Sequence, residues 1–160
     1  MGPHAEQHVV ENFGRNVRAQ PRHVYRPQSE AEVLEILARH RGESIRAVGS
    51  RHSWSEAIVT DGVLVDVAAL CEVQVVDDEG PSRATAGAGC TIFRLVDELR
   101  RQGGLTLPSL GLINKQTIAG ATATGTHGSG RHALGQYINR LRVAHYDDQG
   151  DPTISTIDGG

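Results

Sequence analysis

Aromatic residues, net charge and cysteine are all scarce in this sequence of 160 residues. Phe, Tyr and Trp make up 4% of it, too few for the stacking platforms that bind single-stranded nucleic acid. A net charge of −3 supplies no basic field to attract nucleic acid or an anionic membrane. We therefore expect neither as a partner. The hydrophobic fraction of 38% is typical of a soluble globular domain.

The two cysteines, Cys71 and Cys90, show no metal-binding spacing, and reduced thiols are expected rather than a disulfide. No apolar run approaches the length of a membrane span, and no charged and apolar leader begins the chain. Together these absences predict a cytoplasmic protein.

Glycine, in contrast, is abundant, and the first informative glycine lies in a polar turn. Residues 44–48 read as a short buried strand, and Gly49-Ser50-Arg51-His52-Ser53 follows it. We expect Gly49 to adopt backbone dihedrals that other residues avoid, so that successive amides converge into an anion-binding nest. Arg46 and Arg51 add positive charge. The pattern favours a diphosphate site, and an ordinary Gly-Ser turn is the alternative.

A second stretch, residues 117–130, consists almost entirely of small side chains. From Ala119 to Gly130 every residue except His127 is Gly, Ala, Ser or Thr. Such a run contributes little volume to a core. Small side chains would instead let the backbone lie flat against a large ligand. Amide and hydroxyl groups of the segment could then form hydrogen bonds to the edge of that ligand. Close packing between helices is the alternative.

The remaining pattern predicts short strands and two helices. Ser29 and Glu32 form a capping-box pattern at the start of a helix over 29–41. With strands at 23–27 and 44–48, this helix makes a β-α-β unit. A second helix is expected to start after Thr91 and end at Gly103-Gly104. Residues 12–22 read as a loop, and further strands are expected at 63–67, 73–76, 83–86, 139–146 and 153–157.

The two glycine-containing stretches together resemble the FAD-binding domain of the vanillyl-alcohol oxidase / p-cresol methylhydroxylase family, and most closely its aldonolactone and alditol oxidase branch. Arg46-Ala-Val-Gly-Ser-Arg-His-Ser-Trp54 resembles the pyrophosphate loop of that branch, and Thr117-Ile-Ala-Gly-Ala-Thr-Ala-Thr-Gly-Thr-His-Gly-Ser-Gly130 its second flavin-contacting segment. The approach from Asn12 to Val33 is also similar. The resemblance implies an α+β (α/β) fold of two small mixed-sheet subdomains with flanking helices.

The resemblance also implies FAD as cofactor, attached through His52 to the 8α-methyl carbon of the flavin. Non-covalent FAD, with His52 packed on the ring, is the alternative. The residues expected to bind the cofactor are Arg46, Ala47, Val48, Gly49, Ser50, Arg51, His52, Ser53, Trp54, Ser109, Gly111, Thr117, Gly120, Ala121, Thr124, Gly125, His127, Gly128 and Ser129.

Two of these residues carry a further implication. Glycine at 111 favours an oxidase over a dehydrogenase, because family members with a bulkier residue there tend to react poorly with oxygen. His127 and His132 could be read as metal ligands. Their glycine-rich setting without carboxylates favours a backbone-anchoring or flavin-edge role for His127 instead.

The implied activity is oxidation of a CH–OH group in a sugar alcohol, an aldonolactone or a related small hydroxyl compound, with oxygen as acceptor. Residues 1–11 are expected to be a disordered or vector-derived start, and 12–160 an FAD-binding domain with subdomains 12–80 and 81–160. It would end before the last flavin-domain elements and lack the substrate domain of longer family members. No catalytic residue is therefore assigned. A catalytically inactive flavin-binding or interaction module and a relative of the enolpyruvyl-sugar reductases are the alternatives.

Overall fold

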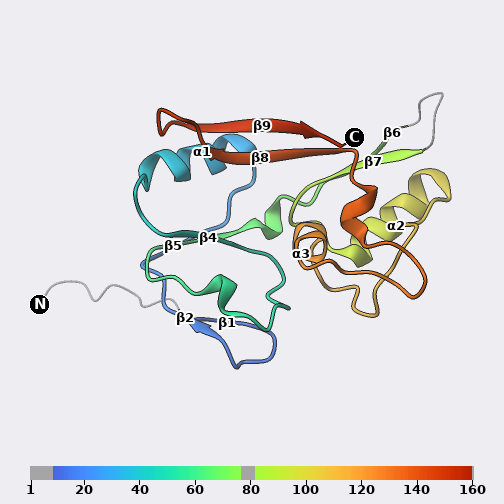
Figure 1. Cartoon of the computed structure of the whole chain (residues 1–160), viewed down its shortest axis with the longest axis horizontal. Coiled ribbons are helices and arrows are strands. Elements are labelled where there is room, and N and C mark those ends of the chain that lie inside the picture. The colour runs from blue at the N-terminus through green and yellow to red at the C-terminus, as the bar shows by residue number, and fades with distance from the viewer. Residues whose placement is uncertain (1–8, 77–81, 160) are drawn as a thin grey trace, which may run out of the picture.

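A computed structural model describes residues 9–76 and 82–159, which form two lobes bridged by a C-terminal hairpin (Figure 1). The fold class agrees with the prediction: the sheets are small, and helices flank them. The first lobe contains β1 (Val10–Glu11), β2 (Arg18–Ala19), β3 (His23–Tyr25), α1 (Glu30–Arg39), β4 (Ile45–Val48) and β5 (Val63–Asp66). The second contains β6 (Val73–Val76), β7 (Arg83–Ala86), α2 (Ile92–Gly103) and α3 (Ile118–Ala123). The hairpin is β8 (Arg140–Tyr146) and β9 (Pro152–Asp158).

A parallel sheet in the order β3-β5-β4 forms the centre of the first lobe, and this confirms the predicted β-α-β unit. Its middle strand is buried on both faces, as its unbroken apolar sequence requires. Val63 and Val65 pack against Ile36 of α1 on one face. Leu64 packs with Val48, Val17 and Ile58 of the 3₁₀ turn Glu56–Ile58 on the other.

Helix α1 begins where the capping pattern predicted. The Ser29 hydroxyl accepts a hydrogen bond from the Glu32 amide at 3.2 Å. The Glu32 carboxylate accepts from the amide of Gln28, one residue before the cap, so the reciprocal half of the box is shifted by one position. Gly42, with φ of +82°, follows the helix and turns the chain back towards β4.

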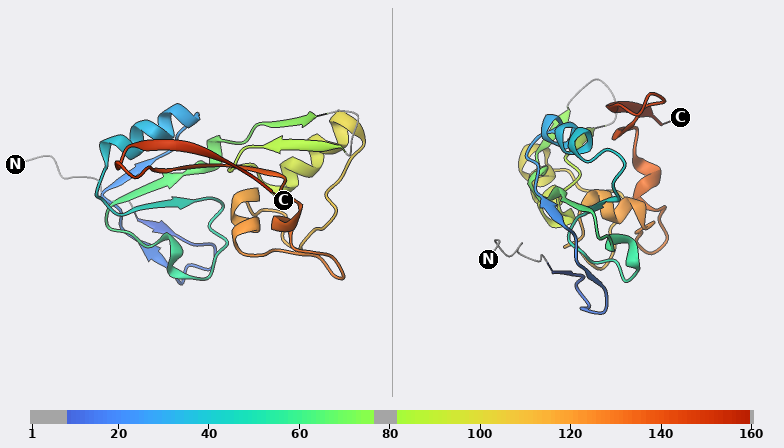
Figure 2. Two further views of the ribbon diagram at one scale, coloured as in Figure 1. Left: turned by 45° about the horizontal axis from the view of Figure 1, so that its top comes forward. Right: turned by 90° about the vertical axis from the view of Figure 1, so that its left-hand side faces the viewer.

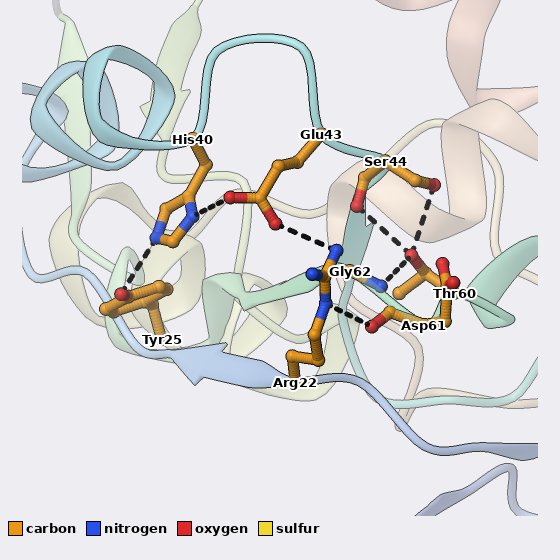
Figure 3. A network of polar contacts seen from close by, with 8 residues as sticks. All are labelled: Arg22, Tyr25, His40, Glu43, Ser44, Thr60, Asp61 and Gly62. Carbon is orange, nitrogen blue, oxygen red and sulfur yellow. Dashed lines mark hydrogen bonds and ion pairs between the residues drawn. The ribbon is translucent and has the colours of Figure 1, made fainter.

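A polar network joins the amino ends of the three parallel strands (Figure 3). The Tyr25 hydroxyl lies 2.9 Å from His40 Nε2, and His40 Nδ1 lies 2.8 Å from the Glu43 carboxylate. Arg22 bonds both Glu43 and the Asp61 carbonyl. On the neighbouring turn, Thr60 bonds Ser44 and Gly62. This end of the sheet is therefore tied together, and the loop after β4 leaves from the opposite end.

The second lobe packs α2 against the antiparallel pair β6–β7. Thr91 caps the helix and Gly104, with φ of +64°, ends it, as predicted. Leu95 and Leu99 of this helix are buried against the sheet, and Ile92 is buried against α3. Cys71 and Cys90 lie in the same core as free thiols, and burial raises the pKa of the Cys90 thiol.

The strands expected at 139–146 and 153–157 pair as the antiparallel hairpin β8–β9, which lies along α1 and extends towards the second lobe (Figure 2). The Arg142 guanidinium donates to the Glu30 carboxylate at 2.7 Å, which lowers the pKa of Glu30. The Tyr146 hydroxyl donates to the Leu37 carbonyl at 2.8 Å. These contacts join the end of the described chain to its first helix.

The structure corrects the prediction near the beginning of the chain. Val10–Glu11, expected in an irregular start, and Arg18–Ala19, expected in a loop, pair as strands β1 and β2. Val17 and Ala19 are buried, so this hairpin is part of the first lobe. Residues 1–8 and the subdomain boundary expected at 80/81 lie outside the described residues.

Candidate functional site

The two glycine-containing stretches meet where Gly49 lies against Thr117. A Cβ atom added to Gly49 would lie 2.3 Å from the Thr117 hydroxyl oxygen, well inside contact distance. Gly49 follows β4, and Thr117 caps α3 and is buried. In the left view of Figure 2, the loop after β4 points towards α3. Two segments that the sequence separates by more than sixty residues are therefore in contact.

The reason for glycine at position 49 differs from the predicted one. Gly49 is not among the residues with positive φ. Its missing side chain is required by the close approach of Thr117 instead. In this loop it is Arg51 that adopts a left-handed backbone conformation, with φ of +59°. Such a conformation is uncommon for residues other than glycine.

The imidazole of His52 stacks on the ring of Phe13, with centroids 4.6 Å apart and planes 26° apart. Backbone contacts flank this pair. The Phe13 amide donates to the Arg51 carbonyl at 2.7 Å, and the Asn12 side chain donates to the Ser53 carbonyl at 2.9 Å. Trp54 packs on Gly14, where a Cβ atom would lie 2.4 Å from the indole.

The other residues of the predicted loop divide between core, surface and an open hollow. Val48 is buried in the core of the first lobe, and Arg46 and Ala47 are exposed on β4. Ser50 and Arg51 line a hollow of about 590 Å³ together with residues of the N-terminal hairpin. The Ser53 hydroxyl bonds that of Ser55 at 2.8 Å.

The second stretch begins as the short helix α3 rather than as a flat segment. The Thr117 hydroxyl accepts from the Gly120 amide at 3.2 Å, and the Thr124 hydroxyl donates to the Gly120 carbonyl at 2.9 Å. Ala121 is fully buried between Ile92 and Leu134, so part of the stretch serves packing, which was the alternative interpretation. Gly125, with φ of +66°, then turns the chain away from the helix.

The end of the second stretch packs on the irregular segment of residues 109–111. The buried Ser109 hydroxyl accepts from the Gly128 amide at 2.9 Å. A Cβ atom on Gly111 would lie 2.7 Å from Cγ2 of Thr126, and one on Gly128 would lie 2.6 Å from the Leu110 carbonyl oxygen. The glycines therefore permit two backbone segments to lie side by side.

His127 is exposed at this end of the stretch. Its Nδ1 lies 3.1 Å from the Gly128 carbonyl oxygen, which is a local backbone contact. A second open hollow, of about 440 Å³, is lined by His127, Gly128, Ser129 and Gly130 together with Arg131, His132 and Tyr137. Among the described residues, no group of three or more His, Cys, Asp or Glu side chains is arranged to hold a metal ion.

Sequence reasoning did not assign Asn12, Phe13 and Arg15 to the site. Asn12 and Phe13 contact the loop directly, and Arg15 lines the first hollow beside Arg51. The only signal for them was the resemblance of the approach from Asn12 onward. Their contacts with the loop depend on the β1–β2 hairpin. Its strands have two residues each, which is too short for a recognisable sequence pattern.

A comparison with known protein families identifies the domain that contains the loop after β4 and the second stretch. Residues 21–148 match the family described as an FAD binding domain, a range that contains the loop after β4 and the whole second stretch. The chain belongs to this family.

Relatives of this FAD binding domain include named oxidases. A long-chain alcohol oxidase from an uncultured marine euryarchaeote is 52% identical over 93% of this chain and 31% of that protein. D-arabinono-1,4-lactone oxidase from Eremothecium gossypii is 36% identical over 94% of this chain and 31% of that protein. The chain thus spans about a third of the length of these relatives.

Solved structures support the fold. Cholesterol oxidase from B. sterolicum superposes with a TM-score of 0.81 at 21% identity, over 95% of this chain and 32% of that one. At this identity the likeness concerns the fold alone. None of the helices in the described part of the FAD binding domain combines the length and apolar character that crossing a bilayer requires.

The residues present fit an FAD molecule chemically. Within the described residues, the guanidinium groups of Arg15, Arg46 and Arg51 have no carboxylate partner, and Arg15 and Arg51 line one hollow. Unpaired guanidinium groups are well suited to phosphate. Neither ring nitrogen of His52 is hydrogen bonded within the same residues.

Proposed function

We propose that this FAD binding domain is the cofactor-binding part of an oxidoreductase that oxidises a CH–OH group of a small-molecule alcohol or lactone, with oxygen as acceptor. The contact between Gly49 and Thr117 carries the proposal, because it joins the loop suited to phosphate with the segment suited to a ring. The names of the alcohol and lactone oxidases among the relatives support the substrate class. FAD supplies the hydride acceptor in such a reaction.

The diphosphate of FAD is assigned to the loop after β4. Backbone amides of residues 49–53 would donate to its oxygens, with Arg51 in the left-handed conformation that anion-binding nests use. Arg46 and Arg51 would supply charge, and Arg15 joins them from the N-terminal hairpin because it lines the same hollow as Arg51. A guanidinium bonds two phosphate oxygens at once, which fixes orientation as well as affinity.

The flavin ring is assigned to the surface between Thr117 and Ser129, with the segment of residues 109–111 beside it. The interpretation rests on the small side chains of residues 119–130 and on Gly111 and Gly128, which let the two backbone segments pack side by side. Exposed hydroxyl groups, such as that of Thr124, would bond the polar edge of the ring. Glycine at 111 favours an oxidase, as the resemblance to the aldonolactone and alditol oxidase branch implies.

His52 is proposed to form a covalent bond from a ring nitrogen to the 8α-carbon of the flavin. In this step the imidazole N–H and one 8α C–H lose their protons as the C–N bond forms. The electron pair that is released would pass to molecular oxygen, which would leave with the two protons as hydrogen peroxide. The nitrogens of His52 have no competing hydrogen bond within the described residues, and neutral imidazole is a competent nucleophile.

Acid precipitation of protein incubated with FAD tests this proposal. We expect wild-type protein to retain flavin fluorescence in the washed pellet, and the His52→Ala variant to release it to the supernatant. His145→Ala, which changes a histidine of β8, is the control and should retain it. Flavin released from wild-type protein would overturn the covalent bond, and absence of any bound flavin would overturn the assigned site.

Peroxide production tests the substrate class. This chain matches about a third of the length of its relatives. We expect peroxide with long-chain alcohols or aldonolactones when the protein also contains the part that corresponds to the rest of those relatives. If this chain alone binds flavin but produces no peroxide, it is a flavin-binding module that needs that further part for turnover.

The free thiols of Cys71 and Cys90 fit a reducing compartment, and we propose the cytoplasm.

A further inference from the structure

Three consecutive residues of the N-terminal hairpin contact all four residues from Arg51 to Trp54. We call residues 12–14 the clamp turn. Asn12 bonds the Ser53 carbonyl, Phe13 bonds the Arg51 carbonyl and stacks on His52, and Gly14 lies against Trp54. The backbone on both sides of His52 is thus held by hydrogen bonds, and its ring is held by a stack.

The clamp turn is itself rigid. Asn12 is buried, with 4% of its surface exposed, and its side chain makes four hydrogen bonds. Its oxygen accepts from the amides of Asn16 and Val17, and its nitrogen donates to the Asn16 side chain and to the Ser53 carbonyl. Because the buried side-chain amide of Asn12 makes all these hydrogen bonds, it fixes the clamp turn and the Ser53 carbonyl.

The stack between Phe13 and His52 orients the imidazole without blocking it. The lone pair that would attack a carbon lies in the plane of the imidazole ring, whereas Phe13 covers a face of the ring. The nitrogens therefore stay available. Without Phe13, the histidine side chain could rotate about two single bonds and would lose this orientation.

We propose that Phe13 is a positioning residue for His52, which holds the imidazole in the orientation needed to bond the flavin 8α-carbon. The inference rests on the proposed attachment at His52. Asn12 contributes by holding the Ser53 carbonyl. Stacking on the imidazole requires the face of an aromatic ring. Tyr or Trp at position 13 should therefore preserve the orientation of His52, and an aliphatic residue should not.

The rate of flavin attachment tests the role of Phe13. Apoprotein is mixed with FAD, samples are precipitated in acid at intervals, and flavin in the pellet is measured. We expect Phe13→Ala to attach flavin about three- to tenfold more slowly than wild type, in line with the strength of aromatic pairs. Phe13→Tyr should restore most of the rate.

Phe93→Ala is a matched control, because Phe93 is 65% exposed and Phe13 is 67% exposed. Phe93 lies on α2, away from the clamp turn, so its removal should leave the attachment rate unchanged. Thermal unfolding of both variants shows whether either has lost its fold. Attachment by a folded Phe13→Ala variant at the wild-type rate would overturn the proposal.

A second measurement separates this proposal from the attachment itself. In NMR spectra of the apoprotein, the ring current of Phe13 should shift the His52 ring protons upfield, and Phe13→Ala should abolish that shift. Wild-type protein that attaches no flavin would overturn the proposed bond. The NMR result would then still decide whether Phe13 orients the imidazole, and an unchanged His52 resonance in Phe13→Ala would overturn that orientation.

Discussion

The Thr117 side chain occupies the space that a side chain at Gly49 would need, with 2.3 Å between the Thr117 hydroxyl oxygen and an added Cβ. The same hydroxyl caps α3 by accepting from the Gly120 amide. One oxygen atom thus caps the start of α3 and sets how closely the loop after β4 approaches it. The two halves of the proposed FAD site share this contact.

Gly49→Ala should therefore destabilise the protein and weaken FAD binding. Forcing a methyl group against Thr117 should lower the free energy of unfolding by about 1–3 kcal/mol. Thr117→Ala removes the obstructing atoms but also the cap, at a cost of about 1 kcal/mol. Urea unfolding of the single and double variants should show a double variant more stable than the sum of the single effects predicts. Gly135→Ala is the control, since its nearest atom would lie 3.6 Å away.

Gly111→Ala should act in two separable ways. Its methyl group would lie 2.7 Å from Thr126 Cγ2, so the variant should lose about 1–3 kcal/mol of stability. Adding Thr126→Ser removes that carbon and keeps the hydroxyl that bonds Gln116. Unfolding should show recovery in the double variant. If Gly111 also admits oxygen to the flavin, stopped-flow reoxidation should remain slower in the recovered double variant than in wild type. A wild-type reoxidation rate there would contradict the role in oxygen access.

Glu43 should make stability depend on pH in the acid range. The hydrogen bond from His40, opposed by desolvation and aided by the charges of His40, Arg22 and His23, lowers the pKa of Glu43 below its ordinary value of 4.5. The ionised carboxylate therefore contributes stability above pH 4.5, and this contribution is lost as the pH falls through the folded-state pKa.

Melting temperatures of wild type and Glu43→Gln, measured from neutral to acid pH, test this dependence. The variant should melt lower at neutral pH, and the difference should vanish in acid. Glu35→Gln, on the exposed side of α1, is the control and should follow the wild-type profile. A difference between Glu43→Gln and wild type that is constant with pH would contradict the ionic contribution.

Several elements were predictable because their signals are local. Ser29 and Thr91 bond amides three residues away, so the start of each long helix can be read from a few neighbouring residues. The run from Val63 to Val65 predicts a buried strand for the same reason. The β1–β2 hairpin was not predicted because its strands have two residues each, and the burial of Val17 and Ala19 depends on tertiary packing. Helix α3 escaped because a run of small residues has no apolar period.

The amino-acid sequence by itself determined the fold class, the main helices and strands, the family and its cofactor, since caps, periodicity and two long motifs are written in consecutive residues. Only the tertiary structure decided that Gly49 must be glycine because of Thr117, and that Phe13 is the partner of His52. Such pairings depend on which distant segments pack together. That packing is set by buried contacts across the whole domain, which no local pattern of residues records.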